Sequence, residues 1–99
     1  MAKYSLTNKA VEDLAKIWDY TFEHWSEQQA DIYYEMLISN CEEIANNSYF
    51  GKPYDGITPN LLGVKANRHI IFHRKIDAQT IEITRILHGR MDLKNRIAE

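Results

Sequence analysis

The chain has 99 residues, of which 44% are hydrophobic and 26% are charged, with a formal net charge of −2 and one cysteine, Cys41. This length fits a single domain over residues 1–99, and this composition is typical of a globular protein rather than a disordered one. The net charge argues against a general polyanion binder, and a lone cysteine excludes an internal disulfide and a cysteine-based zinc site.

The charges are divided unevenly along the chain. Residues 1–60 hold four basic and ten acidic side chains, whereas residues 61–99 hold eight basic and four acidic ones. The basic half predicts a working face for an acidic partner, although the two halves also neutralise each other within one domain. The chain starts with no basic leader and no long apolar run, so we expect no membrane association and a cytoplasmic location.

The chain begins with a predicted strand and a predicted helix. Residues 4–7 alternate in polarity, which favours a strand. Thr7 or Asn8 can cap the helix that follows over residues 8–25, because either side chain can accept a hydrogen bond from the first helical turn. Apolar side chains recur at three- and four-residue steps in this segment, so one face of the helix should be buried.

Ser26 is a second cap, and the helix after it runs to about Asn46. Its apolar stripe matches that of the first helix, so the two helices form a hairpin with facing stripes. We expect the large aromatic side chains of this hairpin to pack in the core or between the helices. They are Trp18, Phe22, Trp25 and Tyr33.

The second half of the chain is strand-like. Residues 48–60 are rich in turn formers, and the apolar period then changes to two over residues 62–66, 68–75 and 81–88. Short connections between these segments predict an antiparallel meander, with a turn at residues 77–79. Alternate residues of the last strand should share one face: Ile81, Ile83, Arg85 and Leu87.

A last helix over residues 91–97, capped by Asp92, completes the order β-α-α-β-β-β-α. We therefore predict an α+β fold in which the helical hairpin packs on one face of a four-stranded, mainly antiparallel sheet. The first strand enters either beside the last strand or at a sheet edge.

The sequence lacks the common patterns of metal and cofactor sites. His69 and His73 are four residues apart, which on a strand is about 13 Å and too far for both to bind one zinc ion. There is no phosphate-binding loop, dinucleotide glycine motif or nucleophile elbow. We expect no cofactor and no metal.

Five basic side chains gather on the predicted sheet and at its exit: Arg68, Arg74, Arg85, His88 and Arg90. Such a set suits phosphate clamping, charge stabilisation in RNA cleavage, or docking of an acidic protein. Arg74 and Arg85 share the parity of apolar neighbours, so each is expected to be half-buried. Asp77 and Asp92 are their candidate partners.

Four stretches carry a resemblance to a known family: "LTNKAVEDLAKIWDYTFEHW", "GKPYDGI", "HIIFHRK" and "RILHGRMD". Together they cover nearly the whole chain, and it resembles the ParE branch of the RelE/ParE toxin family. The resemblance implies the fold predicted above and the toxin of a type II toxin–antitoxin pair. It also implies inhibition of DNA gyrase, and therefore of replication, with neutralisation by a ParD-like antitoxin in a hetero-oligomer. Direct DNA binding by the toxin alone is not expected.

The resemblance implies that the basic residues on the sheet and at its carboxy-terminal end form the toxic surface, which contacts the target. Its residues are Arg68, Arg74, Arg85, His88, Arg90, Met91 and Asp92. The antitoxin is expected on the hairpin and the neighbouring sheet, because a groove there can take an amphipathic helix or an added strand. The residues assigned to it are Trp25, Tyr33, Tyr34, Lys65 and His73.

Two alternatives remain open. RelE-like relatives cut messenger RNA on the ribosome, and Arg68 and Arg90 lie near positions that their arginines occupy. However, "MDLKNRIAE" has no tyrosine, and Lys52 and Lys65 form no tight lysine pair. Cleavage also needs a pair of proton carriers, for which His88 is the best candidate. The second alternative is a non-toxic module that only binds an antitoxin.

Overall fold

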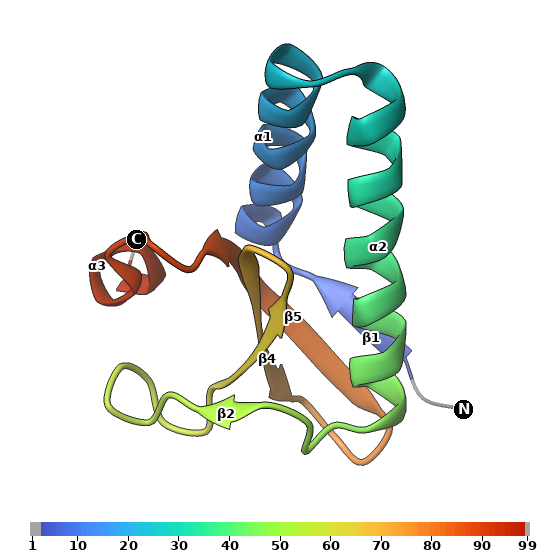
Figure 1. Cartoon of the computed structure of the whole chain (residues 1–99). Helices are drawn as coiled ribbons and strands as arrows, with labels where there is room; N and C mark the ends of the chain where they lie inside the picture. Colours follow the sequence, from blue (N-terminus) through green and yellow to red (C-terminus); the bar gives the residue numbers. More distant parts are fainter. Residues whose placement is uncertain (1–2, 99) are drawn as a thin grey trace.

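The two long helices begin where the sequence places their caps. In the computed structural model, which describes residues 3–98, Thr7 Oγ1 accepts a hydrogen bond from Ala10 N at 3.0 Å. Ser26 Oγ accepts one from Gln29 N at 3.0 Å. These caps start α1 (Asn8–His24) and α2 (Glu27–Asn46), which stand side by side as an antiparallel hairpin (Figure 1).

The remaining elements form one sheet and a short terminal helix. The strands are β1 (Lys3–Leu6), β2 (Lys52–Pro53), β3 (Leu62–Ala66), β4 (His69–Lys75) and β5 (Thr80–His88), and α3 (Leu93–Ala98) follows them. The sheet order is β1-β5-β4-β3-β2, with β1 parallel to β5 and every other neighbouring pair antiparallel. The predicted α+β class and element order are therefore confirmed.

The sheet has five strands rather than the predicted four. The additional strand, β2, comprises only Lys52 and Pro53, which pair with Gly63 and Leu62. Proline has no backbone N–H to donate and is tolerated at a sheet edge, where β2 lies. The other edge is β1, so the first strand is both beside the last strand and at an edge.

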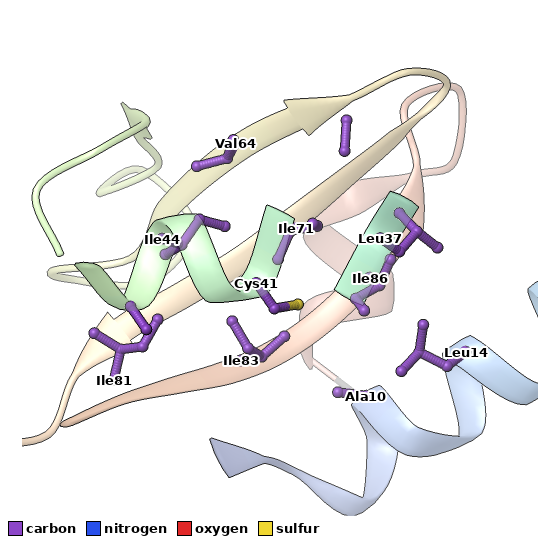
Figure 2. Close-up of a cluster of buried hydrophobic side chains, with 12 residues drawn as sticks. Ala10, Leu14, Leu37, Cys41, Ile44, Val64, Ile71, Ile81, Ile83 and Ile86 are labelled. Carbon is purple, nitrogen blue, oxygen red and sulfur yellow. The ribbon is translucent and has the colours of Figure 1, made fainter. Parts of the chain in front are cut away.

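Apolar side chains of the hairpin cover one face of the sheet (Figure 2). Leu37, Cys41 and Ile44 of α2 are fully buried against Ile71 and Ile83. A smaller cluster on the opposite face joins Phe72 and Leu87 to residues of the 54–61 segment and to α3. The core thus has two layers, which is why a chain with one helical hairpin still buries both faces of its central strands.

The strand alternation changes within β5. Phe72 pairs with Arg85 but His73 pairs with Ile83, so Thr84 is an extra residue in β5. A bulge of this kind reverses the alternation beyond it. Ile86 therefore joins Ile83 in the hairpin-facing core, and Leu87 lies in the other cluster. The predicted shared face of the last strand is wrong beyond Thr84.

The outer end of the hairpin extends beyond the sheet (Figure 1). Phe22 and Trp25 in this region are 47% and 69% exposed, so the prediction that they pack in the core or between the helices is wrong. Trp18 is half-buried; it stacks on Phe22 at 5.3 Å between ring centroids and donates from Nε1 to Asp31 at 3.0 Å.

A buried ion pair joins the hairpin to the sheet. Arg85 Nε and Nη2 donate to the two carboxylate oxygens of Asp13 on α1 at 2.8 and 3.0 Å. The backbone N of Ile86 also donates to Asp13, at 3.1 Å. Arg85 Nη1 donates to the carbonyl oxygen of Arg96, so the same guanidinium reaches α3.

The two expected arginine partners are therefore wrong. Arg85 is bound by Asp13 rather than by Asp92, which instead caps α3 through Asn95. Arg74 pairs with Glu82 at 2.9 Å rather than with Asp77, and its side chain is 54% exposed. Asp13 had no signal in the sequence, because it lies 72 positions from Arg85. Within residues 3–98, no helix has the length and apolar character to cross a membrane.

Replacing Asp13 by alanine should lower the free energy of unfolding by about 3–5 kcal/mol, because it leaves a buried guanidinium without its carboxylate. Urea denaturation measures the difference. Asp19→Ala is the matched control, since Asp19 is an exposed aspartate on the same helix, and we expect a change of less than about 0.5 kcal/mol. Equal losses in the two variants would mean that the ion pair contributes nothing specific.

Leu37→Ala should destabilise the protein more than Trp18→Ala. Leu37 is fully buried, so its truncation leaves a cavity and costs about 3 kcal/mol or more. Trp18 is only half-buried, so truncation removes the partly exposed stack on Phe22 and one exposed hydrogen bond. Thermal unfolding of both variants would show the order, and the reverse order would contradict this placement of the core.

Candidate functional site: a groove between the hairpin and the sheet

A groove of about 760 Å³ lies between the helical hairpin and the adjoining end of the sheet. Ile17, Trp25 and Met91 are among the apolar residues that line it, and Arg68 and Arg90 are exposed basic residues along it. Asp13 is the one carboxylate among its lining residues, and Arg85 already binds that group. The groove therefore offers apolar surface together with unneutralised positive charge. We call it the hairpin groove.

Two histidines meet at the floor of the hairpin groove. The antiparallel register of β4 and β5 places His69 opposite His88, and their rings contact edge to face with 5.4 Å between centroids. Tyr33 of α2 reaches the same place, with its hydroxyl 2.7 Å from His69 Nδ1. Residues of helix and sheet that are 36 positions apart are thus tied together at this floor.

Backbone hydrogen bonds hold the two turns beside the histidines. The Arg68 N–H donates to the Tyr33 hydroxyl at 3.4 Å, and the Gly89 N–H donates to the Arg68 carbonyl oxygen at 3.0 Å. The Arg90 N–H donates to His88 Nδ1 at 3.1 Å. The two exposed arginine side chains therefore project from backbone that is fixed on both sides of the groove floor.

Burial shapes the titration of these groups. Loss of hydration is the main cause that lowers the pKa of His69 to about 4; the neighbouring His88 acts in the same direction, and Asp13 opposes it. Loss of hydration also raises the pKa of the Tyr33 hydroxyl. His69 and Tyr33 are therefore both uncharged at neutral pH.

The hairpin groove brings together members of both predicted residue sets. Those that line it are Arg68, His88, Arg90 and Met91 from the expected toxic surface, and Trp25 and Tyr33 from the expected antitoxin surface. The sequence offered no reason to merge the two sets, because the hairpin and the sheet exit are far apart along the chain. In the structure they form opposite walls of one groove.

The other predicted site residues lie elsewhere. Arg85 and His73 are 8% and 0% exposed, so neither side chain offers a contact surface, which corrects both expectations. His73 Nε2 is hydrogen-bonded to the Phe50 carbonyl at 2.8 Å, and Asp92 caps α3. Four of the predicted site residues are exposed outside the hairpin groove: Tyr34 on α2, Lys65 on β3, Arg74 on β4 and Asp92 before α3.

The match to known proteins is extensive. A family model described as "ParE toxin of type II toxin-antitoxin system, parDE" matches residues 4–93. The chain belongs to the ParE toxin family. The toxin is 32% identical over 96 residues to Toxin ParE1 of Mycobacterium tuberculosis, a match that covers 97% of this chain and 98% of that protein.

Two further relatives extend this likeness. Toxin ParE1 of Caulobacter vibrioides is 30% identical, with 95% of this chain and 96% of that protein covered. A solved structure described as "Chromosomal ParDE TA system from P. aeruginosa" aligns with a TM-score of 0.77 at 18% identity, covering 89% of this chain and 95% of that one. At that identity the alignment supports the fold alone.

Sequence reasoning missed His69 as a site residue, although it considered and dismissed this histidine as a metal ligand. Direct pairing of the two predicted strands through the short turn would place His69 opposite Leu87. The extra residue at Thr84 places His69 opposite His88 instead, so no local signal in the sequence indicated this pair. Within the residues that the structure describes, no group of three or more histidine, cysteine or acidic side chains could hold a metal ion.

The toxin should lose stability as the pH falls from about 6.5 toward 4. The pKa of His69 is lowered on folding, so the unfolded chain binds a proton in this range that the folded chain does not. The stability is complete above the unfolded pKa of about 6.5 and declines below it. Burial lowers the pKa of His73 in the same direction. Urea midpoints measured at several pH values would show the slope, and His69→Phe should make it shallower. A slope unchanged by that variant would contradict the assignment.

Proposed function

We propose that this ParE-family toxin inhibits DNA gyrase and so blocks replication, and that a ParD-like antitoxin neutralises it by occupying the hairpin groove. The observation that carries the proposal is that members of both predicted surfaces line one groove: Arg68, His88, Arg90 and Met91 from the toxic surface, and Trp25 and Tyr33 from the antitoxin surface. If target and antitoxin both use this groove, then antitoxin binding excludes the target directly. No movement of the toxin is needed for neutralisation.

The groove has the composition of a protein-binding surface. Tyr20, Trp25 and Met91 line it and are 61%, 69% and 42% exposed. Large exposed apolar side chains of this kind, next to arginine, are enriched at interface hot spots. Arg68 and Arg90 add positive charge that attracts an acidic partner. Both features favour binding to a protein over binding to bare DNA.

The antitoxin partner is supported by membership of the family and by the aligned Pseudomonas structure, which is described as a ParDE system. An amphipathic segment suits the groove because its apolar face can cover Trp25 and Met91 while its acidic residues face the arginines. We expect the neutralised form to be a hetero-oligomer of toxin and antitoxin. Family membership and the cationic, apolar character of the groove support gyrase as the target of this proposal.

The double variant Arg68→Ala/Arg90→Ala should weaken inhibition of gyrase supercoiling on the order of tenfold or more, equivalent to about 1.4 kcal/mol of lost binding. Gyrase supercoiling of relaxed plasmid, titrated with toxin, gives the inhibitory concentration. Arg74→Ala is the matched control, because Arg74 is an exposed arginine outside the groove and should leave inhibition unchanged. Wild-type toxin without effect on supercoiling would refute the proposed target.

Ribosome-dependent cleavage of messenger RNA is the second candidate. The observation that favours it is the His69–His88 pair beside two arginines, because RNA cleavage needs two proton carriers and a phosphate clamp. Toxin added to a translating extract should then shorten ribosome-bound messenger RNA, and His69→Phe should abolish the cleavage. Intact message at concentrations that inhibit gyrase would exclude this candidate.

A further inference from the structure

We infer that His69 and His88 form a paired N–H donor site at the floor of the hairpin groove, which binds a carboxylate side chain of the antitoxin. This inference rests on the proposed function, since it specifies which chemical group of the antitoxin the groove recognises. Hydrogen bonds at Nδ1 of each imidazole ring determine which nitrogen carries the proton.

The tautomer of His88 is set by the backbone. The Arg90 N–H is a donor, and its hydrogen bond to His88 Nδ1 at 3.1 Å requires a lone pair on that nitrogen. A neutral imidazole carries one proton, so the proton of His88 must be on Nε2. The ring therefore presents an N–H group rather than a lone pair at its other nitrogen.

The tautomer of His69 follows from Tyr33. The Tyr33 hydroxyl accepts from the Arg68 N–H at 3.4 Å, which leaves its own proton available to donate. We assign that proton to the contact of 2.7 Å with His69 Nδ1, so that Nδ1 is the acceptor, and nitrogen-15 NMR tests this assignment. His69 likewise carries its proton on Nε2. Because the pKa of His69 is about 4, the ring is neutral at physiological pH and keeps this arrangement.

Both Nε2 atoms are open to solvent. Among the residues that the structure describes, His73 Nδ1 is the one buried side-chain nitrogen or oxygen without a hydrogen-bond partner. The Nε2 atoms of His69 and His88 therefore have solvent contact, where a ligand can replace water. We infer that these two N–H donors, on rings whose centroids are 5.4 Å apart, serve one acceptor with two oxygens.

The same arrangement distinguishes this site from an acid–base pair. A general base needs an accessible lone pair, and the lone pair of each ring is already used at Nδ1. The pair is therefore suited to binding an acceptor rather than to removing a proton from one. These hydrogen bonds favour recognition over RNA cleavage at the groove floor.

The surroundings favour a peptide carboxylate over a phosphate of nucleic acid. Ile17 and Met91 provide apolar surface along the groove, which suits an amphipathic peptide. The exposed Asp19 and Glu23 on α1 would repel a polyanion, and the whole chain has a net charge of −2. The titratable and charged residues that line the groove around the pair are Asp13, Lys16, Tyr20, Tyr33, Arg68 and Arg90.

The first test is the tautomeric state of the free toxin. Nitrogen-15 NMR of the imidazole groups at pH 7.5 should show His69 and His88 as Nε2–H tautomers. A protonated Nδ1 on either ring would overturn the inference, whatever the antitoxin result. This measurement does not depend on the proposed function.

The second test measures binding of the cognate antitoxin to the folded toxin by calorimetry. His88→Phe keeps a ring but removes the donor, and should weaken binding at least fivefold. His88→Gln restores an N–H donor, so it should recover most of the affinity. His24→Phe is the matched control, because His24 is an exposed histidine on the hairpin that does not line the groove, and its affinity should equal that of wild type.

Coupling between His88 and one acidic residue of the antitoxin gives a readout that a purely structural role would not move. In a double-mutant cycle, one antitoxin Glu→Gln or Asp→Asn change should lose its effect in the His88→Phe background.

The outcomes separate the two hypotheses. Tight antitoxin binding that is unaffected by His88→Phe, with no coupling to any acidic residue, overturns the carboxylate site and leaves the proposed function intact. No binding of the antitoxin to wild-type toxin overturns both. Circular dichroism of each variant identifies loss of fold, and His88→Leu then replaces His88→Phe in the cycle because it also removes the donor.

Discussion

The bidentate ion pair between Asp13 and Arg85 is the constraint on which the rest of the arrangement depends. It joins α1 to β5, and the same guanidinium reaches the backbone of α3. A buried pair of this kind contributes little net stability compared with apolar residues, but it is costly to break on one side. Its value here is positional, because it sets where the hairpin stands on the sheet. The hairpin groove exists between those two elements.

The bulge at Thr84 contributes the second constraint. Without the extra residue, each side chain of β5 beyond Thr84 would point to the opposite face of the sheet, and Ile86 would leave the hairpin-facing core. With it, His88 lies opposite His69 and next to the hairpin. A single inserted residue in the middle of the strand therefore determines which side chains reach the groove floor. Features of this type commonly occur next to functional sites, where they redirect side chains.

The sequence predicted the elements well because their signals are local. Caps at Thr7 and Ser26, apolar periods and turn residues each act over a few positions, and the structure follows them. The basic exit around His88 and Arg90 was also visible as a composition change. What could not be predicted depends on pairing between distant residues.

Three features illustrate this limit. Asp13 looked like any helix-surface carboxylate until the fold placed it against Arg85, 72 positions away. The pairing of β5 with β4 shifts by one residue at Thr84, and this shift leaves no trace in the apolar pattern of the sequence. Phe22 and Trp25 match a buried stripe, yet the outer end of the hairpin extends beyond the sheet (Figure 1), and both side chains are exposed. Periodicity identifies which face is apolar, but not how far the covering partner extends.

The parallel pairing of β1 with β5 has a consequence for synthesis on the ribosome. The earliest strand to emerge finds its neighbour only when residues 80–83 have been made, and Thr7 bonds to Thr84 across 77 positions. Long-range pairings of this kind are completed late and make folding slow. The nascent chain therefore lacks a finished groove until residues 80–91 have been made and paired. Under the proposed function, a freshly made toxin would act only after this late pairing, which would leave an interval in which an antitoxin can reach it.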